Sequence, residues 1–376
     1  MSIGAGIAAD APSTRSEALL ALCRTHGFAL AGIADARPGC HADAFRAWVA
    51  AGKHGPMAYL AEELERRIDP RILVPGAVSV LCVADRYHDG RPDRHVPGEG
   101  RIARYARGED YHAVIRARLE SVAAELLAAH PAHRFRACVD TAPVLERDHA
   151  ERAGLGRIGK HTLLIGAGGV GTWLVLGCIV STLPLAAVRA DGLPAGSEAP
   201  DPCGGCTRCI DACPTDAIAP WSVDARRCIS TVTIEDRGDV DPWFAGRMGA
   251  WVFGCDDCQE ACPHSQPTRR SRAIGAHEAY RGGTGTVPLL EVLGWTAEDM
   301  ERARLNGVLR RADLSMWRRN AALAAADALL SADTPHALRE ALRASLAAVA
   351  LDADATVPVR NAARAALRAG GVGSVP

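Results

Sequence analysis

Eight of the thirteen cysteines in this 376-residue chain fall between positions 203 and 262. The first four lie in CGGCTRCIDACP, which begins at Cys203, and spacers of two, two and three residues separate them before a final proline. In this spacing, three thiolates bind one 4Fe–4S cluster and the fourth binds a second cluster. CDDCQEACP, from Cys255, supplies three more cysteines, and Cys228 lies alone between the groups. The pattern therefore predicts two iron–sulfur clusters.

Eight thiolates supply four ligands to each of two clusters. The usual exchange of ligands between the groups gives one cluster Cys203, Cys206, Cys209 and Cys262, and the other Cys213, Cys228, Cys255 and Cys258. The short spacers let the thiolates converge, and Gly204 and Gly205 relieve crowding in the first turn. The alternative is a pair of structural zinc sites. Because zinc does not require this spacing, we favour the clusters; the other five cysteines are scattered and are expected in the core.

Two clusters carry electrons, so a separate site must use them. Gly166, Gly168 and Gly171 form G-x-G-x-x-G after an apolar run, as in a dinucleotide-binding turn. That turn requires a helix after the glycines, where the pyrophosphate binds. Residues 172–182 are instead rich in β-branched and aromatic side chains, which favours a strand. We therefore predict a β-hairpin with a glycine-rich turn, and no dinucleotide site.

The composition is that of an ordinary soluble protein of two or three domains, with 48% hydrophobic and 23% charged residues. No signal peptide or membrane span is evident, so we expect a cytoplasmic protein with reduced thiols and no membrane contact. A net charge of −1 argues against nucleic-acid binding by bulk charge. Local density can still bind phosphate, and arginines gather late in the chain: Arg269, Arg270, Arg272, Arg281, Arg302, Arg304, Arg310, Arg311, Arg318 and Arg319. Taken alone, these residues are explained equally by a solvated helical surface.

Strand-like and helix-like segments alternate before the cysteines, which predicts an α/β core. The expected elements are a helix and a strand over 14–35, a strand over 75–87, a helix over 111–130 and a strand over 135–140. The last strand ends in Asp140, and a helix is expected from Thr141 to a stop at Gly154. Residues 186–201 are rich in Pro, Gly, Ala and Asp and are expected to form a linker.

The C-terminal part contains a weak repeat. RRNAALAAADALL, from Arg318, recurs as VRNAARAALRAG, from Val359, with a period of 41 residues. This period falls in the range of paired-helix repeats of HEAT type. Two copies cannot stand alone as a solenoid, so the module is expected to pack on the rest of the protein. The predicted domains are an α/β domain over 1–190, a ferredoxin-like domain over 191–285 and a helical domain over 286–376.

Together with the cysteines and the terminal RRNAALA from Arg318, five segments resemble the epoxyqueuosine reductase family, the cobalamin-dependent enzymes of the last step of queuosine synthesis on tRNA. The segments are RIDPRILVPGAVSVL from Arg67, RIARYARGEDYH from Arg101, VDTAPVLERDHAERAGLG from Val139, IGKHTLLI from Ile158 and RRCISTVTIE from Arg226. The resemblance implies an α/β cobalamin-binding domain with an embedded two-cluster ferredoxin-like domain and a C-terminal α-helical HEAT-like repeat that binds tRNA. It also implies a monomer and an external low-potential electron donor.

The implied reaction reduces the epoxide of epoxyqueuosine, at the wobble position of tRNA, to the cyclopentenediol of queuosine. The clusters would feed a base-off corrinoid, whose Co(I) state is a strong nucleophile and reductant. The departing oxygen needs a proton, and in the family the aspartate of V-D-T-A-P-V-L-E-R, here Asp140, supplies it. Burial beside the corrin is expected to raise the pKa of Asp140. From the residues alone, Asp140 is more simply a cap of the helix expected at Thr141.

The resemblance also indicates which side chains contact the corrinoid. They are Tyr105, Asp140, Lys160, His161 and Thr162, with Ser230 and Thr231 on the ferredoxin-like side. His161 is not expected to bind cobalt, since the family holds the corrinoid base-off. Two positions depart from the family pattern: Arg157 stands where tryptophan is frequent, and Ser-Thr-Val at 230–232 where Ser-Tyr-Leu is frequent. The lining of the pocket is therefore left open.

Two other functions fit parts of the sequence. A reductive dehalogenase would share the corrinoid and clusters, but such enzymes typically carry a twin-arginine export signal and lack an arginine-rich helical end. A non-catalytic electron-transfer protein would need the clusters alone, and bound cobalamin would count against it. Failure to bind tRNA would favour the dehalogenase. For the main interpretation, neutralising Arg310, Arg311, Arg318 and Arg319 together is expected to weaken tRNA binding and flatten its salt dependence.

Overall fold

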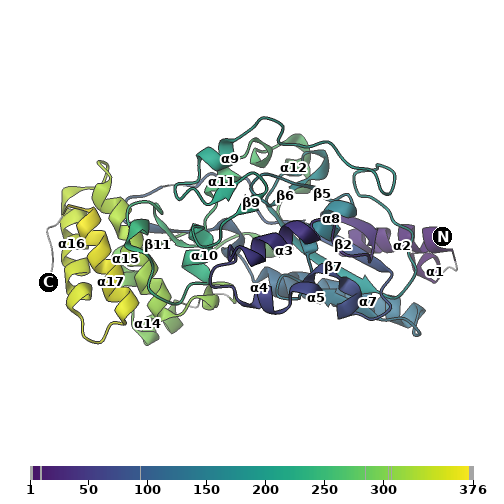
Figure 1. Ribbon diagram of the computed structural model, residues 1–376, viewed down its shortest axis with the longest axis horizontal. Helices are drawn as coiled ribbons and strands as arrows, with labels where there is room; N and C mark the ends of the chain where they lie inside the picture. The colour runs from purple at the N-terminus through teal and green to yellow at the C-terminus, as the bar shows by residue number, and fades with distance from the viewer. Residues whose placement is uncertain are drawn as a thin grey trace.

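The computed structural model describes residues 3–8, 11–93, 95–283, 285–303, 305 and 307–371. The molecule is elongated, with the N-terminal helices at one end and the C-terminal helices at the other (Figure 1). Two clusters of buried apolar side chains lie on the two faces of the main sheet, and a third joins the C-terminal helices to the cysteine-rich part. Arg304 lies outside the described residues. Among the helices described, none is long and apolar enough to cross a bilayer.

The main sheet has four strands in the order β1-β2-β7-β4, and every pairing is antiparallel. The strands are β1 (Leu30–Asp35), β2 (Ser79–Arg86), β4 (Phe135–Cys138) and β7 (Leu174–Ser181). Helices α2 (Pro12–Thr25) and α7 (Tyr111–Ala129) cover one face and α8 (Glu146–Arg152) covers the other, so β2 is buried along its whole length. Gly177 allows the close approach of α7, because an added Cβ would lie 2.6 Å from Ile115.

The predicted elements of this part are confirmed, with shorter bounds. The helix and strand of 14–35 are α2 and β1, the strand of 75–87 is β2, the helix of 111–130 is α7 and the strand of 135–140 is β4. The helix expected from Thr141 begins only at Glu146, and Gly154, at a φ of 72°, follows its end as expected. Residues 186–201 form a connection whose one strand-like contact is the bridge from Val188 to Ile33.

The hairpin predicted around the glycines is wrong. The apolar run before them forms β6 (Leu164–Gly166), which pairs with β5 (Gly156–Ile158), whereas β7 pairs with β2 and β4. One bridge, between Gly166 and Gly171, closes the turn. A short 3-10 turn, η2 (Ala167–Gly169), and then strand β7 follow the glycines, so they do not open a dinucleotide-binding helix.

A second sheet, in the order β10-β3-β11, ties three parts of the chain together. Its strands are β3 (Glu99–Ile102), β10 (Trp251–Phe253) and β11 (Thr286–Pro288), and a separate pair is formed by β8 (Ile218–Ala219) and β9 (Ser222–Val223). The short helices are α1 (Ile3–Ile7), α3 (Ala42–Ala50), α4 (Tyr59–Glu62), α5 (Leu64–Ile68), α6 (Pro70–Leu73), α9 (Arg208–Asp211), α10 (Ile229–Ile234), α11 (Asp257–Glu260), α12 (Arg269–Ile274), α13 (Leu289–Leu293) and α14 (Ala297–Arg302). The 3-10 turns are η1 (Arg104–Ala106), η3 (Pro242–Phe244), η4 (Pro263–Ser265), η5 (Glu278–Tyr280) and η6 (Leu309–Arg311).

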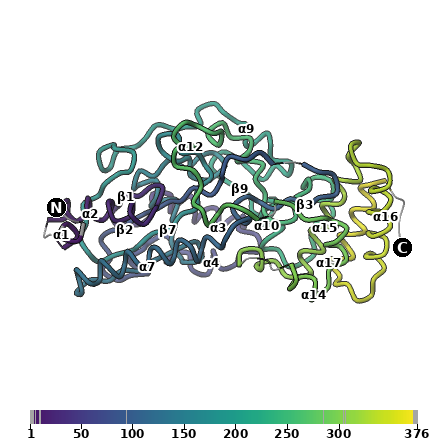
Figure 2. The backbone as a smooth tube through the Cα atoms, turned by 180° about the vertical axis from the view of Figure 1, so that it is seen from behind, coloured from purple at the N-terminus to yellow at the C-terminus, as the bar shows by residue number. Residues whose placement is uncertain are grey.

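Three longer helices end the chain: α15 (Leu314–Leu330), α16 (His336–Leu351) and α17 (Val357–Ala369). They lie together at the end of the molecule opposite α1 and α2 (Figure 2). The two copies of the repeat fall on α15 and α17, which pack on each other. The expected packing on the rest of the protein is present, because Asn320 donates to the carbonyls of Thr233 and Val252, both at 2.9 Å.

Candidate active site and cluster-binding cysteines

Asp140 follows β4 and turns the chain sharply out of the sheet. Its φ of 48° lies in the left-handed region, which non-glycine residues seldom adopt and which is often retained at functional sites. Its Oδ2 atom accepts hydrogen bonds from the Tyr111 hydroxyl and from Nε2 of His112, both at 2.9 Å. Because α8 begins at Glu146, with Leu145 at its cap, Asp140 does not cap the following helix, and that alternative is wrong.

His112 lies between two carboxylates. Asp110 caps α7 by accepting the His112 backbone N–H, and its Oδ1 atom also lies 2.8 Å from Nδ1 of the ring. The other ring nitrogen bonds Asp140. Burial lowers the pKa of His112, but the hydrogen bonds and charges of Asp140 and Asp110 outweigh burial and raise it. The two carboxylates therefore favour the protonated form of the ring beside Asp140.

The pKa of Asp140 is lowered, in contrast to the expectation from the sequence. Burial acts to raise it, but the hydrogen bond and charge of His112 and the Tyr111 hydroxyl act more strongly in the opposite direction. The side chain is 59% exposed, even though desolvation by surrounding protein is the largest single influence on it. The carboxylate is therefore accessible although protein surrounds it closely, and its surroundings, with Tyr111, His112, Glu146 and Arg147, are called the recess.

Tyr111 and His112 are functional candidates that the sequence interpretation did not single out. The available signal was the Asp-Tyr-His triplet at the start of the predicted helix. It lies inside one of the segments that carry the resemblance, with an N-cap residue directly before the tyrosine. Their contact with Asp140 spans 28 and 29 positions and depends on how α7 crosses the sheet. The local sequence pattern does not predict how α7 lies across the sheet.

Tyr105, in η1, separates the Asp140 group from the cysteine-rich part. Its ring packs edge-on against Tyr111, with centroids 6.0 Å apart. On the other side it adjoins Gly254, where an added Cβ would lie 3.5 Å from the tyrosine ring. Because Gly254 directly precedes Cys255, one aromatic ring spans the gap between the hydrogen-bonded carboxylate and the second cysteine group.

The recess also contains polar atoms without a partner. Oε1 of Glu146 and Nε2 of His161 are both buried, and neither has a hydrogen-bond partner within the described part of the chain. The charge of Arg147 acts on both groups, and its guanidinium donates to the carbonyl of Thr162 at 2.6 Å. Unsatisfied buried polar atoms are costly unless a ligand completes them. A ligand rimmed with amides, as a corrinoid is, fits this lining.

The eight cysteines are free thiols, and they fall into two neighbouring groups. Burial raises the pKa of Cys209, and three nearby thiols act in the same direction. These three thiols belong to Cys203, Cys206 and Cys262. Within the described ranges, no three His, Cys, Asp or Glu side chains converge as they would around a single metal ion.

The second group is more deeply enclosed. Burial is the main cause that raises the pKa of Cys255, and the thiols of Cys258 and Cys228 add to it. Cys213 acts in the same way on Cys228. The two groups adjoin, because Cys209 also contributes to the raised pKa of Cys258. These influences bring the eight thiols into one neighbourhood, and their division between two clusters stays a prediction.

The polar residues expected at the corrinoid divide between the recess and the cysteines. Nζ of Lys160 donates to the carbonyls of Gly204 and Cys206, at 2.7 and 3.0 Å, and its backbone N–H lies 3.4 Å from Sγ of Cys203. The backbone N–H groups of Ser230 and Thr231 donate to the Cys228 thiol. These contacts hold cysteines in place, and Thr162 alone of this set contacts Arg147 in the recess.

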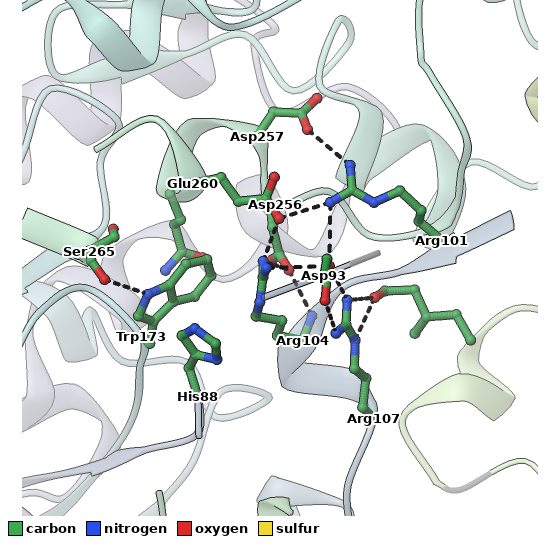
Figure 3. A network of polar contacts seen from close by, with 12 residues as sticks. His88, Asp93, Arg101, Arg104, Arg107, Trp173, Asp256, Asp257, Glu260 and Ser265 are labelled. Carbon is green, nitrogen blue, oxygen red and sulfur yellow. Dashed lines mark hydrogen bonds and ion pairs between the residues drawn. The ribbon is translucent and has the colours of Figure 1, made fainter. Parts of the chain in front are cut away.

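A network of charged side chains joins the second cysteine group to η1 and β3 (Figure 3). Arg104 is 8% exposed and donates from its backbone N–H to Asp256 at 2.8 Å and from its guanidinium to Glu260. Arg101 also reaches Glu260, at 2.8 Å, and Asp93 is surrounded by the arginines of this segment. Asp256 and Glu260 flank cysteines, so the arginines fix the cysteine loop to η1, which carries Tyr105.

Of the four C-terminal arginines expected to bind tRNA, three form hydrogen bonds or ion pairs with other groups of the protein. Arg319 is 1% exposed and donates to the backbone carbonyls of Asp236, Gly238 and Val232, so of the four arginines expected to act together on tRNA this one is not available at the surface. Arg318 donates to Leu293 and Asp352. Arg311 pairs with Glu235 at 2.7 Å, near the recess, and Arg310 remains exposed.

Comparison with known proteins agrees with these features. Residues 67–141 match the family model "Epoxyqueuosine reductase QueG, DUF1730", and residues 202–265 match "4Fe-4S double cluster binding domain". The second match favours clusters over zinc. Both matched segments carry the groups described above.

Curated relatives extend the similarity along the chain. The epoxyqueuosine reductase of Xanthomonas campestris pv. campestris is 37% identical over 349 residues, covering 89% of this chain and 93% of the relative. That of Synechococcus sp. RCC307 is 38% identical over 322 residues, covering 84% and 96%. The fold is similar to a crystal structure of an epoxyqueuosine reductase with an epoxyqueuosine-modified tRNA-Tyr stem loop, with a TM-score of 0.76, 24% identity and coverage of 94% and 90%. The chain belongs to the epoxyqueuosine reductase family and is an oxidoreductase.

Proposed function

We propose that this protein reduces epoxyqueuosine to queuosine at the wobble position of tRNA, with Asp140 as the proton donor. The observation that carries the proposal is the position of the Asp140–His112–Tyr111 group, which one tyrosine ring separates from the Cys255 loop. Electrons and protons can therefore meet at one recess. An electron-transfer protein without catalysis would have no use for the carboxylate, and family membership removes that alternative.

The cofactors we propose are two 4Fe–4S clusters and one base-off corrinoid. One cluster takes Cys203, Cys206, Cys209 and Cys262, and the other takes Cys213, Cys228, Cys255 and Cys258. The corrinoid would occupy the recess at Asp140, where the unpartnered atoms of Glu146 and His161 suit its amide rim. When bound, it would supply a strongly reducing cobalt centre. Tyr105 and Thr162 would line it, whereas Lys160, Ser230 and Thr231 would act on the clusters through the cysteines.

The side chains around Asp140 can deliver a proton to the departing oxygen. Reduction of an epoxide to an alkene consumes two electrons and two protons and releases the oxygen as water. When protonated, the His112 ring would hold one proton against Oδ2 of Asp140, and its raised pKa favours this form. As negative charge develops on the departing oxygen, Asp140 can relay this proton to it, and Asp110 stabilises the charge on the histidine ring. Tyr111 fixes the orientation of the carboxylate.

The domains follow from these roles. We propose a cobalamin-binding α/β domain over 1–190, a ferredoxin-like domain over 191–285 and a HEAT-like helical domain over 286–376 that contacts tRNA. The protein would act in the cytoplasm as a monomer and receive electrons from an external low-potential donor. Arg318 and Arg319 donate to groups within the protein. Among Arg310, Arg311, Arg318 and Arg319, Arg310 is therefore best able to bind a phosphate of the tRNA.

The test is anaerobic reconstitution with iron, sulfide and cobalamin, followed by turnover on epoxyqueuosine-containing tRNA with a chemical reductant. Queuosine should form, as measured by mass spectrometry of the digested nucleosides. Matched samples without cobalamin, or with the iron chelated, should form none. Turnover that does not depend on cobalamin would contradict the proposed role of the recess. Binding of both cofactors without queuosine formation would point to another reducible substrate.

A further inference from the structure

Arg67, in α5, is a buried arginine that has no anionic partner among the residues that the structure describes. The residue is 6% exposed, and its Nε atom is sealed from solvent without a hydrogen bond. Among the residues described, its one polar side-chain contact is with the ring of Tyr59, whose centroid lies 5.5 Å from the guanidinium carbon. A buried cation is costly without a counter-ion. The position is therefore suited to an anion supplied from outside the chain.

Arg67 lies beside the Asp140 recess. Its carbonyl accepts a hydrogen bond from the backbone N–H of Leu145, in the loop between Asp140 and α8. Tyr59 is 39% exposed, and burial and then the charges of Glu235 and Asp140 are among the influences that raise the pKa of its hydroxyl. The tyrosine that stacks on Arg67 is thus within electrostatic reach of the catalytic carboxylate.

The carboxylates in this neighbourhood already have cationic partners. The pairs are Asp140 with His112, Glu235 with Arg311, Glu63 with Arg66 and Glu65 with Arg46. None of these carboxylates is paired with Arg67. The neighbouring Arg66 shows the ordinary alternative, since its side chain is 49% exposed and lies 2.7 Å from Glu63.

We infer that Arg67, stacked on Tyr59, binds a phosphodiester group at the edge of the Asp140 recess. The forked donors of a guanidinium match phosphate oxygens, and the tyrosine face holds the fork in place. This inference rests on the proposed function, because both ligands of the proposed enzyme carry a phosphodiester. One lies in the nucleotide tail of a base-off corrinoid and the other in the backbone of RNA. The amide side chains of the corrin ring are neutral and would not pair with Arg67.

The test measures binding rather than turnover. Wild type, Arg67→Gln and the control Arg66→Gln are titrated with cobalamin, with cobinamide, which lacks the phosphodiester tail, and with an unmodified tRNA anticodon stem loop. Loss of a charged hydrogen-bonding partner should weaken one phosphodiester ligand by about ten- to a hundredfold. The control, whose arginine is exposed and already paired, should bind all three ligands as wild type does.

The binding measurements distinguish the two possible sources of the phosphodiester, the corrinoid tail and the RNA backbone. Weaker cobalamin binding with unchanged cobinamide and stem-loop binding assigns the corrinoid tail. Weaker stem-loop binding with a shallower salt dependence and unchanged cobalamin binding assigns the RNA. Wild-type affinity of a folded Arg67→Gln for both ligands overturns the inference, and so does an equal loss for cobalamin and cobinamide.

A second measurement needs no variant. At constant ionic strength, inorganic phosphate should compete with cobalamin or with the stem loop for the wild-type protein, and competition with neither overturns the inference. The results also separate this inference from the proposed function. Binding without queuosine formation would refute the proposed function and leave the Arg67 assignment in place, whereas a wild-type protein that binds neither ligand would refute both.

Discussion

Replacement of Asn320 tests how the C-terminal helices are anchored to the cluster-binding part. The side chain is fully buried, and its amide donates to two backbone carbonyls, of Thr233 in α10 and of Val252 in β10. Its oxygen accepts from Arg319 at 2.9 Å. Asn320→Ala removes two neutral bonds of about 1 kcal/mol each and one charged bond of about 1.5–3 kcal/mol, and it leaves buried carbonyls unsatisfied. We expect the free energy of unfolding to fall by about 3–5 kcal/mol.

Asn361→Ala is the matched control, because it changes the same position of the second repeat. Asn361 donates to the exposed carboxylate of Asp239 at 3.1 and 3.2 Å, so its loss should cost less than about 1 kcal/mol. Urea titration followed by tryptophan fluorescence measures both variants, since Trp317 is buried in the same helix as Asn320. If Asn320→Ala unfolds within about 1 kcal/mol of wild type, the anchoring role is refuted.

Three further changes test the site. Because the pKa of His112 is raised, wild-type kcat/KM should fall as the pH rises through that pKa, and His112→Gln should lack this alkaline limb; an unchanged limb would implicate another group. Lys160→Met should lower the iron and sulfide bound after reconstitution, whereas Arg208→Met, an exposed change on α9, should not; equal iron contents would contradict the role of Lys160. Gly254→Ala places a Cβ 2.5 Å from that of Ala103 at a φ of 68°, so the melting temperature should fall by several degrees; an unchanged melting temperature would show that the loop adjusts.

The parts of the fold that depend on local pattern could be predicted from the sequence. The apolar rhythm of α7 and the β-branched run of β2 report burial directly, and both elements lie where the pattern indicates. The spacing of the cysteines is similarly local, because short loops constrain thiolates regardless of the surrounding fold. The pairing of β6 was not local. It pairs with β5 rather than with β7 across the glycine turn, and strand periodicity does not identify the partner.

A local feature of the sequence accounts for the late start of α8. Pro143 disfavours helical backbone at Ala142, so a helix could not run continuously from Thr141. The chain instead turns at Asp140 and begins the helix at Glu146. This delay frees the carboxylate from capping and directs it toward His112.

The arginine content of the C-terminal part predicts that it is basic, but not which arginines are exposed and which bind groups inside the protein. Arg319 and Arg310 are nine positions apart, yet one is buried among backbone carbonyls and the other is exposed. Composition cannot distinguish these cases, because the difference depends on whether an unpaired carbonyl lies opposite the helix. The same limit applies to Arg67, whose burial without a partner emerges only from the packing around α5.

The most direct test of the central claim is queuosine formation by wild type and Asp140→Asn, each loaded to the same iron and cobalamin content. The isosteric amide keeps the hydrogen-bonding shape at Oδ2 but cannot relay a proton to the departing oxygen. We expect the variant to bind the modified tRNA normally and to form queuosine at least a hundredfold more slowly. Wild-type rates of queuosine formation by Asp140→Asn would contradict the claim that this carboxylate is the proton donor.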